Sequence, residues 1–326
     1  MNKIEKKLIQ LAEDIINGKE ISYEDALEIE GVTQEEFLVL LYAANSVRKH
    51  FRGNYVSLCS IINAKSGNCT EDCKFCAQSV HYHTGVKTYD LIDEEEIYKA
   101  AKEARKIHSL RLGIVTSGES ICKKDELNKI KKMLKGLKKN SDIERCASLG
   151  CLTKEDFIDL KNAGLERFHH NLETARSFFP KVCTTHSYDK RVQTVLDAKA
   201  AGLKVCSGGI FGLGESFSQR VEFAFELKKL NVDSLPLNFL CPISGTPFEN
   251  YEKLKPIEVL KIIAMFRLVL PNKEIKACAG RQFLGSFEPF IFFAGADGMM
   301  IGNFLTIGGK DPLEDLKMIE DLGLEI

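Results

Sequence analysis

The spacing of apolar side chains predicts a helical segment at the start of the chain. Apolar residues recur there every three or four positions, as on one face of a helix: Ile4, Leu8, Leu11 and Ile15. Ser22-Tyr23-Glu24-Asp25 and Thr33-Gln34-Glu35-Glu36 each match a helix-capping box, with Gly31 as a stop between them. We therefore predict a helical extension over residues 1–50.

From Tyr55 onward, short β-rich runs alternate with amphipathic stretches. The runs predict eight strands, over residues 55–62, 111–116, 144–148, 166–171, 204–207, 234–240, 274–279 and 298–302. Helices are predicted to follow the successive strands, over residues 93–106, 124–138, 153–163, 187–201, 218–229, 256–270, 287–295 and 312–322. Eight strand–helix pairs favour a parallel (β/α)8 barrel of the TIM type over residues 51–326. The active site of such a barrel lies at the C-terminal ends of its strands.

Composition narrows the functional classes. Of the 326 residues 44% are hydrophobic and 28% are charged, which suits a folded core, and the formal net charge of −1 gives no reason to expect nucleic acid or a membrane as partner. The charged, amphipathic start has no apolar signal core, and no run reaches the roughly 18 apolar residues of a membrane span. We therefore expect a cytoplasmic protein. Because disulfides are rare in the cytosol, its 11 cysteines indicate metal binding or buried thiols.

Three of these cysteines lie close together in the segment 68–79, directly after the first predicted strand. Cys69, Cys73 and Cys76 follow the spacing C-x3-C-x2-C. A structural zinc site requires four N or S ligands, whereas three thiolates suit a 4Fe–4S cluster with one iron left open. Purely structural thiols or a zinc site remain the alternative.

The spacing resembles the signature of the radical S-adenosylmethionine (SAM) enzymes, in which an aromatic residue, here Phe75, usually precedes the last cysteine. In that superfamily SAM binds the open iron, and one electron cleaves it to methionine and a 5′-deoxyadenosyl radical. The resemblance implies a 4Fe–4S cluster and SAM as cofactors.

Other strand ends bring thiols and polar side chains to the same face of the predicted barrel: Cys146, His169, His170, Asn171, Cys206, Asn238, Cys241, Cys278 and Arg281. One buried cysteine is an ordinary small core residue. Several cysteines beside Asn, His and Arg indicate a second metal centre. The remaining thiols lack such neighbours in the sequence and are expected to be structural: Cys59, Cys122, Cys151 and Cys183.

Several motifs, in the right order from about residue 50 to the C-terminus, resemble biotin synthase. They are Cys69–Ser79, His170–Thr174, Thr184–Tyr188, Lys204–Ile210, Gly212–Glu215, Gly245–Pro247 and Ala279–Arg281. The resemblance implies a homodimer that inserts sulfur into dethiobiotin and receives electrons from a donor such as flavodoxin or ferredoxin. It assigns Cys69, Cys73 and Cys76 to the 4Fe–4S cluster. It places Asn171 and Asn238 near the ureido group of dethiobiotin, and Arg191, with Gly118 and Glu119, near SAM.

The sequence departs from the family at a second cluster. Most biotin synthases hold a sulfur-donating 2Fe–2S centre with three cysteines and an arginine. Cys146, Cys206 and Arg281 match three of these ligands, but Gly113 stands where the remaining cysteine is expected. The arrangement resembles a branch of the family found in anaerobes, which implies a larger auxiliary iron–sulfur cluster.

Residues 278 and 281 differ by three positions, so a continuous strand cannot point both into the barrel. We predict that Cys146, Cys206 and Cys278 hold an auxiliary cluster of about four irons. Cys241 is the candidate fourth ligand, and Arg281 lies beside the cluster.

Two alternatives remain at this point. One is another radical SAM enzyme on the same barrel, of the hydrogenase-maturation or methylornithine-forming type. The other is a non-catalytic iron–sulfur carrier, which would not release methionine and 5′-deoxyadenosine on reduction.

Overall fold

The strands close into a parallel barrel, as predicted. The computed structural model describes residues 1–121 and 124–326, so Cys122 lies outside the described residues. Its strands are β1 (Ser57–Lys65), β2 (Arg111–Thr116), β3 (Glu144–Ser148), β4 (Arg167–His169), β5 (Lys204–Cys206), β6 (Gly209–Phe211), β7 (Ser234–Phe239), β8 (Glu274–Ala277) and β9 (Gly298–Met300). They hydrogen-bond in the order β5-β4-β3-β2-β1-β9-β8-β7-β6, and Cys206 of β5 also pairs with Ser234 of β7. That last pairing closes the ring.

The fifth position of the barrel is shared by β5 and β6. The glycine-rich run beginning at Gly208 was not predicted as a strand, yet Gly209 pairs with Leu237 of β7. A Cβ atom on Gly209 would lie 2.2 Å from the carbonyl oxygen of Glu173, so only glycine permits this approach to the end of β4. The barrel therefore has eight strand positions, one of them interrupted at residues 207–208.

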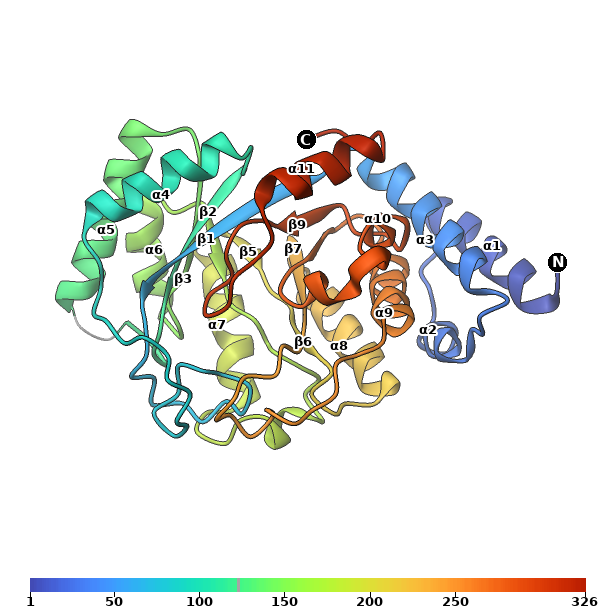
Figure 1. Ribbon diagram of the computed structural model, residues 1–326, viewed down its shortest axis with the longest axis horizontal. Helices are drawn as coiled ribbons and strands as arrows, with labels where there is room; N and C mark the ends of the chain where they lie inside the picture. The colour runs from blue at the N-terminus through green and yellow to red at the C-terminus, as the bar shows by residue number, and fades with distance from the viewer. Residues whose placement is uncertain (122–123) are drawn as a thin grey trace.

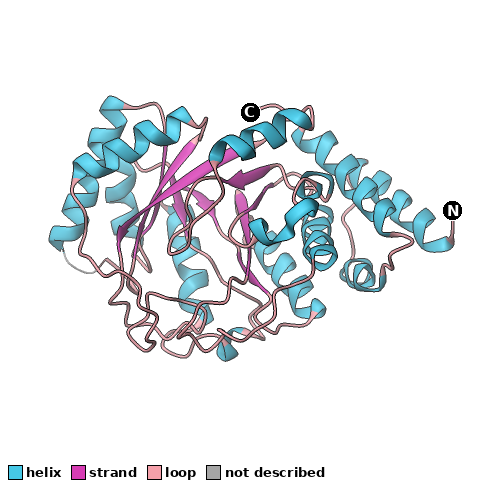
Figure 2. Ribbon diagram, in the orientation of Figure 1, coloured by secondary structure: helices cyan, strands magenta, loops and turns pink. Residues whose placement is uncertain are grey.

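Helices surround the barrel in the predicted alternation (Figures 1 and 2). They are α4 (Glu94–Lys106), α5 (Lys124–Asn140), α6 (Lys154–Asn162), α7 (Tyr188–Ala200), α8 (Phe217–Lys229), α9 (Pro256–Val269), α10 (Phe290–Phe293) and α11 (Pro312–Asp321). Short 3-10 turns cover Ile29–Gly31, Phe179–Lys181 and Arg281–Phe287. No helix among the described residues is long and apolar enough to span a membrane.

Three helices precede the first strand: α1 (Lys3–Ile16), α2 (Tyr23–Glu28) and α3 (Phe37–Arg52). The Ser22 side chain accepts from the Asp25 amide at the start of α2, which confirms that cap. Helix α3 packs against α9, and α9 is buried along almost its whole length. A helix covered on both sides needs apolar residues all round, which explains the predominantly apolar sequence of α9.

Buried charges fill the N-terminal end of the barrel. Arg111 binds Glu144 at 2.5 Å and Glu274 at 2.6 Å, and Arg167 binds Glu144 at 3.0 Å. The hydroxyl groups of Ser57 and Ser234 accept from the two arginines. This polar network closes one end, so a ligand enters from the opposite end, where the loops gather along the lower edge of Figure 1.

Candidate active site

The predicted cysteine motif forms a closed loop after β1. The Cys69 amide donates to the Gln78 carbonyl at 3.0 Å, and the Val80 amide donates to the Cys69 carbonyl at 2.8 Å. The Gly67 amide adds a bond to the Gln78 side chain at 3.1 Å. These bonds join the two ends of the loop, so its three thiols are held by one short segment.

A second segment fixes this loop from outside. The Asp72 carboxylate accepts from the amides of Thr184 at 2.8 Å and Thr185 at 3.2 Å, and the Lys74 amide donates to Val182 at 3.0 Å. The segment 182–186 directly precedes α7. The Thr-Thr-His motif that is far away in the sequence therefore serves to position the cysteine loop.

The loop borders a cavity of about 170 Å³. All three motif thiols line it, and so do Gly118, Glu119 and Arg191, which were predicted to contact SAM. Arg191 donates to His186 at 2.8 Å and to the Asn171 carbonyl at 2.9 Å. Glu119 pairs with Lys190. The structure thus brings the expected cofactor residues to one place.

The donor chemistry of the loop suits a cluster. Burial raises the pKa of Cys69, and it raises that of Cys76 to about 11, so both stay protonated unless a metal draws off the protons. Within the described part of the chain, one group has three donor atoms within 4.8 Å of one another, as a single ion requires: Cys73, Cys183 and His186. The three motif thiols do not form such a group, so they lie too far apart to bind one ion together. This wider spacing fits a larger iron–sulfur centre.

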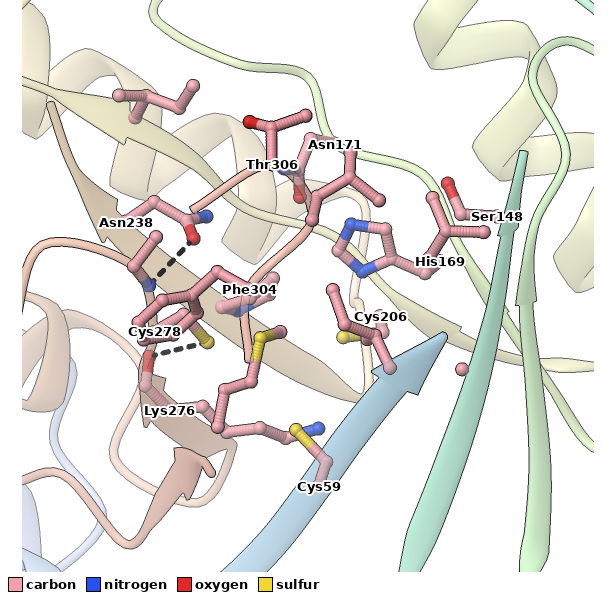
Figure 3. Close-up of a pocket in the computed structure, with 18 of the residues that line it drawn as sticks. Cys59, Ser148, His169, Asn171, Cys206, Asn238, Lys276, Cys278, Phe304 and Thr306 are labelled. Atoms are coloured by element: carbon pink, nitrogen blue, oxygen red, sulfur yellow. Dashed lines mark hydrogen bonds between the residues drawn. The ribbon is translucent and has the colours of Figure 1, made fainter. Parts of the chain in front are cut away.

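A second cavity, of about 340 Å³, occupies the barrel interior (Figure 3). Four buried thiols line it, namely Cys59 on β1, Cys146 on β3, Cys206 on β5 and Cys278 just after β8. Cys241 also lines it, but is only partly buried. The three predicted ligands of the auxiliary cluster, Cys146, Cys206 and Cys278, therefore line one cavity.

The two cavities meet at the ends of β3 and β4. Ser148, His169, Asn171 and Glu173 line both of them, as does Cys76 of the loop. A group bound at the loop therefore faces a molecule bound in the barrel interior.

Comparison with known proteins assigns the family. A model of the Radical SAM superfamily matches residues 64–227, and one of the Biotin and Thiamin Synthesis associated domain matches residues 236–325. The biotin synthase of Geotalea daltonii is 51% identical over 320 residues, covering 98% of this chain and 97% of that relative. That of Pelotomaculum thermopropionicum is 47% identical over 97% of this chain and 99% of the relative. The chain belongs to the biotin synthase family.

The solved structures agree on the fold alone. Methylornithine synthase superimposes with a TM-score of 0.85 at 21% identity, covering 97% of this chain and 96% of that one. A maturase of the [FeFe]-hydrogenase gives 0.83 at 17% identity, covering 98% and 75%. The barrel is thus shared with the two enzyme types considered as alternatives. The identity to biotin synthases settles the family in favour of the predicted one, a radical SAM enzyme that uses a 4Fe–4S cluster, SAM and an auxiliary iron–sulfur cluster.

Both predicted substrate asparagines line the interior cavity of this biotin synthase family member. The Asn171 side-chain oxygen accepts from the Gly208 amide at 3.1 Å, while Asn238 donates to the Gly209 carbonyl at 3.1 Å and accepts from the Ala279 amide at 3.2 Å. Both asparagine side chains therefore cap strand ends. Because a carboxamide has two donor hydrogens and two lone pairs, each retains capacity for a ligand.

Arg281 lies elsewhere. Its guanidinium is fully buried, pairs with Glu288 and with Asp315 of α11, and donates to the Met300 carbonyl at 3.0 Å. It does not line the interior cavity, because Gly280 takes a left-handed turn (φ 90°) that ends the strand before it. Arg281 thus has carboxylate partners of its own and does not border the cavity, so the ligand set proposed below does not include it, and its place beside the auxiliary cluster stays a prediction.

Two cavity residues were missed from the sequence: Cys59, which was expected to be structural, and Lys276. Lys276 lies two positions before Cys278, so the alternation of a strand places both on one face. This spacing of two could have predicted from the sequence that Lys276 faces the same cavity as Cys278. For Cys59 the sequence offered none, since both faces of a barrel strand are buried and apolar. Of the other thiols expected to be structural, Cys151 lines the loop cavity and Cys183 lies 3.2 Å from the Asp72 carboxylate.

Proposed function

We propose that this chain inserts sulfur into dethiobiotin to form biotin. The observation that supports this most directly is the junction of the two cavities, which places the loop thiols and the barrel interior on either side of His169 and Asn171. When bound, the reduced cluster and SAM supply a carbon radical, the kind of reagent that unactivated C–H bonds require and that acid, base or nucleophilic side chains cannot replace.

The residues of the loop cavity bind and orient the cofactors. Cys69, Cys73 and Cys76 hold the 4Fe–4S cluster. Arg191 is fixed by His186 and the Asn171 carbonyl, so its charge is available to an anionic group of SAM without further ordering. Gly118 and Glu119 border SAM from the end of β2.

The barrel interior binds the substrate and the sulfur source. Asn171 and Asn238 use their remaining donors and acceptors on the ureido group, which offers N–H donors and a carbonyl acceptor. Cys146, Cys206 and Cys278 hold the auxiliary cluster on the opposite, deeper side. The cavity is closed below by the polar network of Arg111, which keeps water from that end.

Anaerobic reconstitution tests the function. Protein loaded with iron and sulfide, given SAM and reductant, should form biotin from dethiobiotin together with methionine and 5′-deoxyadenosine. A preparation loaded with zinc serves as the control, because Cys73, Cys183 and His186 offer a single-ion site. Cleavage of SAM that is independent of dethiobiotin, with no biotin formed, would reject the substrate and leave only the radical SAM chemistry.

We also propose a homodimer in the cytoplasm, reduced by a flavodoxin or a ferredoxin. Apolar side chains are exposed on two helices that pack against each other, Leu38 and Tyr42 on α3 and Phe290 and Phe293 on α10. Such an exposed apolar surface supports an interface between copies of the chain.

We propose that residues 1–50 form a helical extension distinct from the barrel of residues 51–326. This extension contributes Leu38 and Tyr42 to the proposed dimer interface. Light scattering on Tyr42→Asp protein checks the assignment, since a monomer is expected.

A further inference from the structure

Cys59 has the position of a ligand. It is the third residue of β1, is 8% exposed, and lines the interior cavity with Cys146, Cys206 and Cys278. Figure 3 shows Cys59, Cys206 and Lys276 directed into the same space from three different strands. The register explains this: Cys59 pairs with Met300 of β9 on one side and with Arg111 of β2 on the other, and both partners also face the interior.

The position of Gly113 indicates why β1 supplies a thiol. Gly113 lines the cavity from β2 and pairs with Ile61, two residues beyond Cys59 on the same face of β1. A Cβ atom at Gly113 would already lie 3.1 Å from the Ile61 side chain, so a larger residue there is crowded. Strand β2 thus presents no donor at this level. Cys146 of β3 pairs directly with Gly113, and β1 presents its inward-facing thiol two residues before Ile61, at Cys59.

Cys241 differs from the four interior thiols in position and burial. The four lie on barrel strands or directly after one and are buried, whereas Cys241 follows the end of β7 and is only partly buried. Its sulfur accepts from Gln282 at 3.9 Å. Cys241 is therefore a rim residue.

Lys276 supplies positive charge at this place. Its side chain is 3% exposed, and its ion pair with Glu274 is long, at 3.7 Å. A loosely paired buried ammonium is costly unless other negative charge is near. Thiolates in the same cavity provide such charge.

We propose that Cys59 is the fourth thiolate ligand of the auxiliary cluster, with Cys146, Cys206 and Cys278, and that Lys276 is a positioning residue whose charge offsets these thiolates. The proposal rests on the proposed function only in requiring an auxiliary cluster. Four donors from four strands match a 4Fe–4S cluster with every iron bound to cysteine. They do not fit one zinc ion, because ligands at about 2.3 Å from a metal lie within roughly 4 Å of one another. Among the described residues no such group includes these thiols.

The test counts iron in a chain that lacks the loop cluster. Cys69, Cys73 and Cys76 are first changed to Ala in the full-length protein, which leaves only the auxiliary cluster, with about four irons. Adding Cys59→Ala should lower the iron content to about three or fewer, and should change the Mössbauer spectrum because one iron loses its thiolate. Cys241→Ala in the same background is the matched control and should keep the full content.

Unchanged iron and spectrum in the Cys59→Ala chain would overturn the proposal, and so would equal losses in the two variants. Circular dichroism, together with retention of the loop cluster when Cys59→Ala is made alone, shows whether the barrel is still folded. Lys276→Met should lower the reduction potential of the cluster, since a positive charge is removed, and Lys276→Arg should restore most of it. No shift with Lys276→Met would remove Lys276 from the proposal. None of these readouts requires dethiobiotin, so a different substrate would refute the proposed function and leave this result standing.

Discussion

The cysteine loop and the interior thiols are two ways of gathering sulfur ligands. The loop carries Cys69, Cys73 and Cys76 within eight positions of one segment, closed by its own backbone bonds and fixed by the segment 182–186. The interior thiols, Cys59, Cys146, Cys206 and Cys278, come from four strands that span most of the chain. The loop thus depends on local bonds, and the interior set depends on strand register and on closure of the barrel.

The surroundings of the loop thiols and of the interior thiols also differ. The loop cavity is bordered by side chains fixed mainly by hydrogen bonds, such as Arg191 and His186. The interior thiols lie above a buried network of charges centred on Arg111. A change in one region should therefore have little effect on the other, and variants in each region test this independence.

The largest effect is expected from the loop. Cys76→Ala leaves two thiolates, which cannot hold a site-differentiated cluster, so formation of 5′-deoxyadenosine should fall to background. The same is expected for Cys69→Ala and Cys73→Ala. The auxiliary cluster should persist, with about four irons left of about eight. Retention of SAM cleavage in any of the three variants would contradict the radical mechanism.

Cys206→Ala should have the converse result. This residue faces Lys276, whose ammonium, against the effect of burial, lowers the pKa of the Cys206 thiol to about 6. Without Cys206 the auxiliary cluster should lose at least one iron, while the loop cluster remains and SAM cleavage continues without biotin formation. Product analysis by mass spectrometry separates the two activities, and loss of both together would show that the regions are coupled.

Arg111→Met should reduce stability by about 3–5 kcal/mol, because it leaves Glu144 and Glu274 buried with fewer partners. Although burial opposes it, the charges of Lys276 and Arg111 lower the pKa of Glu274 from 4.5 to about 2. A carboxyl group whose pKa is lower in the folded state stabilises the protein above pH 4.5, and this contribution is lost as the pH falls from 4.5 toward 2. When the pH is lowered, the Arg111→Met variant should therefore unfold at a higher pH than the parent protein.

Urea denaturation at neutral pH and an acid titration measure both effects of Arg111→Met. Arg105→Met is the matched control, since Arg105 pairs with Asp142 at the surface and the change should cost under about 1 kcal/mol. Equal effects from the two arginines would show that the buried network contributes little.

The smallest effect is expected where the loop cavity and the interior cavity meet. Asn171 lines both cavities, and Asn171→Ala should weaken dethiobiotin binding by about 1–3 kcal/mol, because ureido groups are left unpaired. Calorimetry on the reconstituted protein measures this, with exposed Asn162→Ala as control. Binding that is unchanged in Asn171→Ala would leave Asn171 as only a strand cap.

Much of the architecture could be predicted from the sequence, because alternation and helical period are local properties. Strands β2 and β3 have the predicted bounds, and the other strand predictions overlap the observed ones. Strand β6 was missed because glycine has low strand propensity, and only the pairing with β7 makes residues 209–211 extended. The ion pair of Arg281 with Asp315 could not be predicted for a similar reason, because the two residues lie 34 positions apart.

The sequence by itself determined the cysteine loop, the barrel and the family resemblance, since each depends on short spacings or on their order. Only the tertiary structure decided which thiols share the interior. A barrel strand is buried on both faces, so the pattern of Ser57–Lys65 does not show that Cys59 points inward. Strand register and ring closure set that direction, and they bring Cys59 to Cys206 across almost half of the chain.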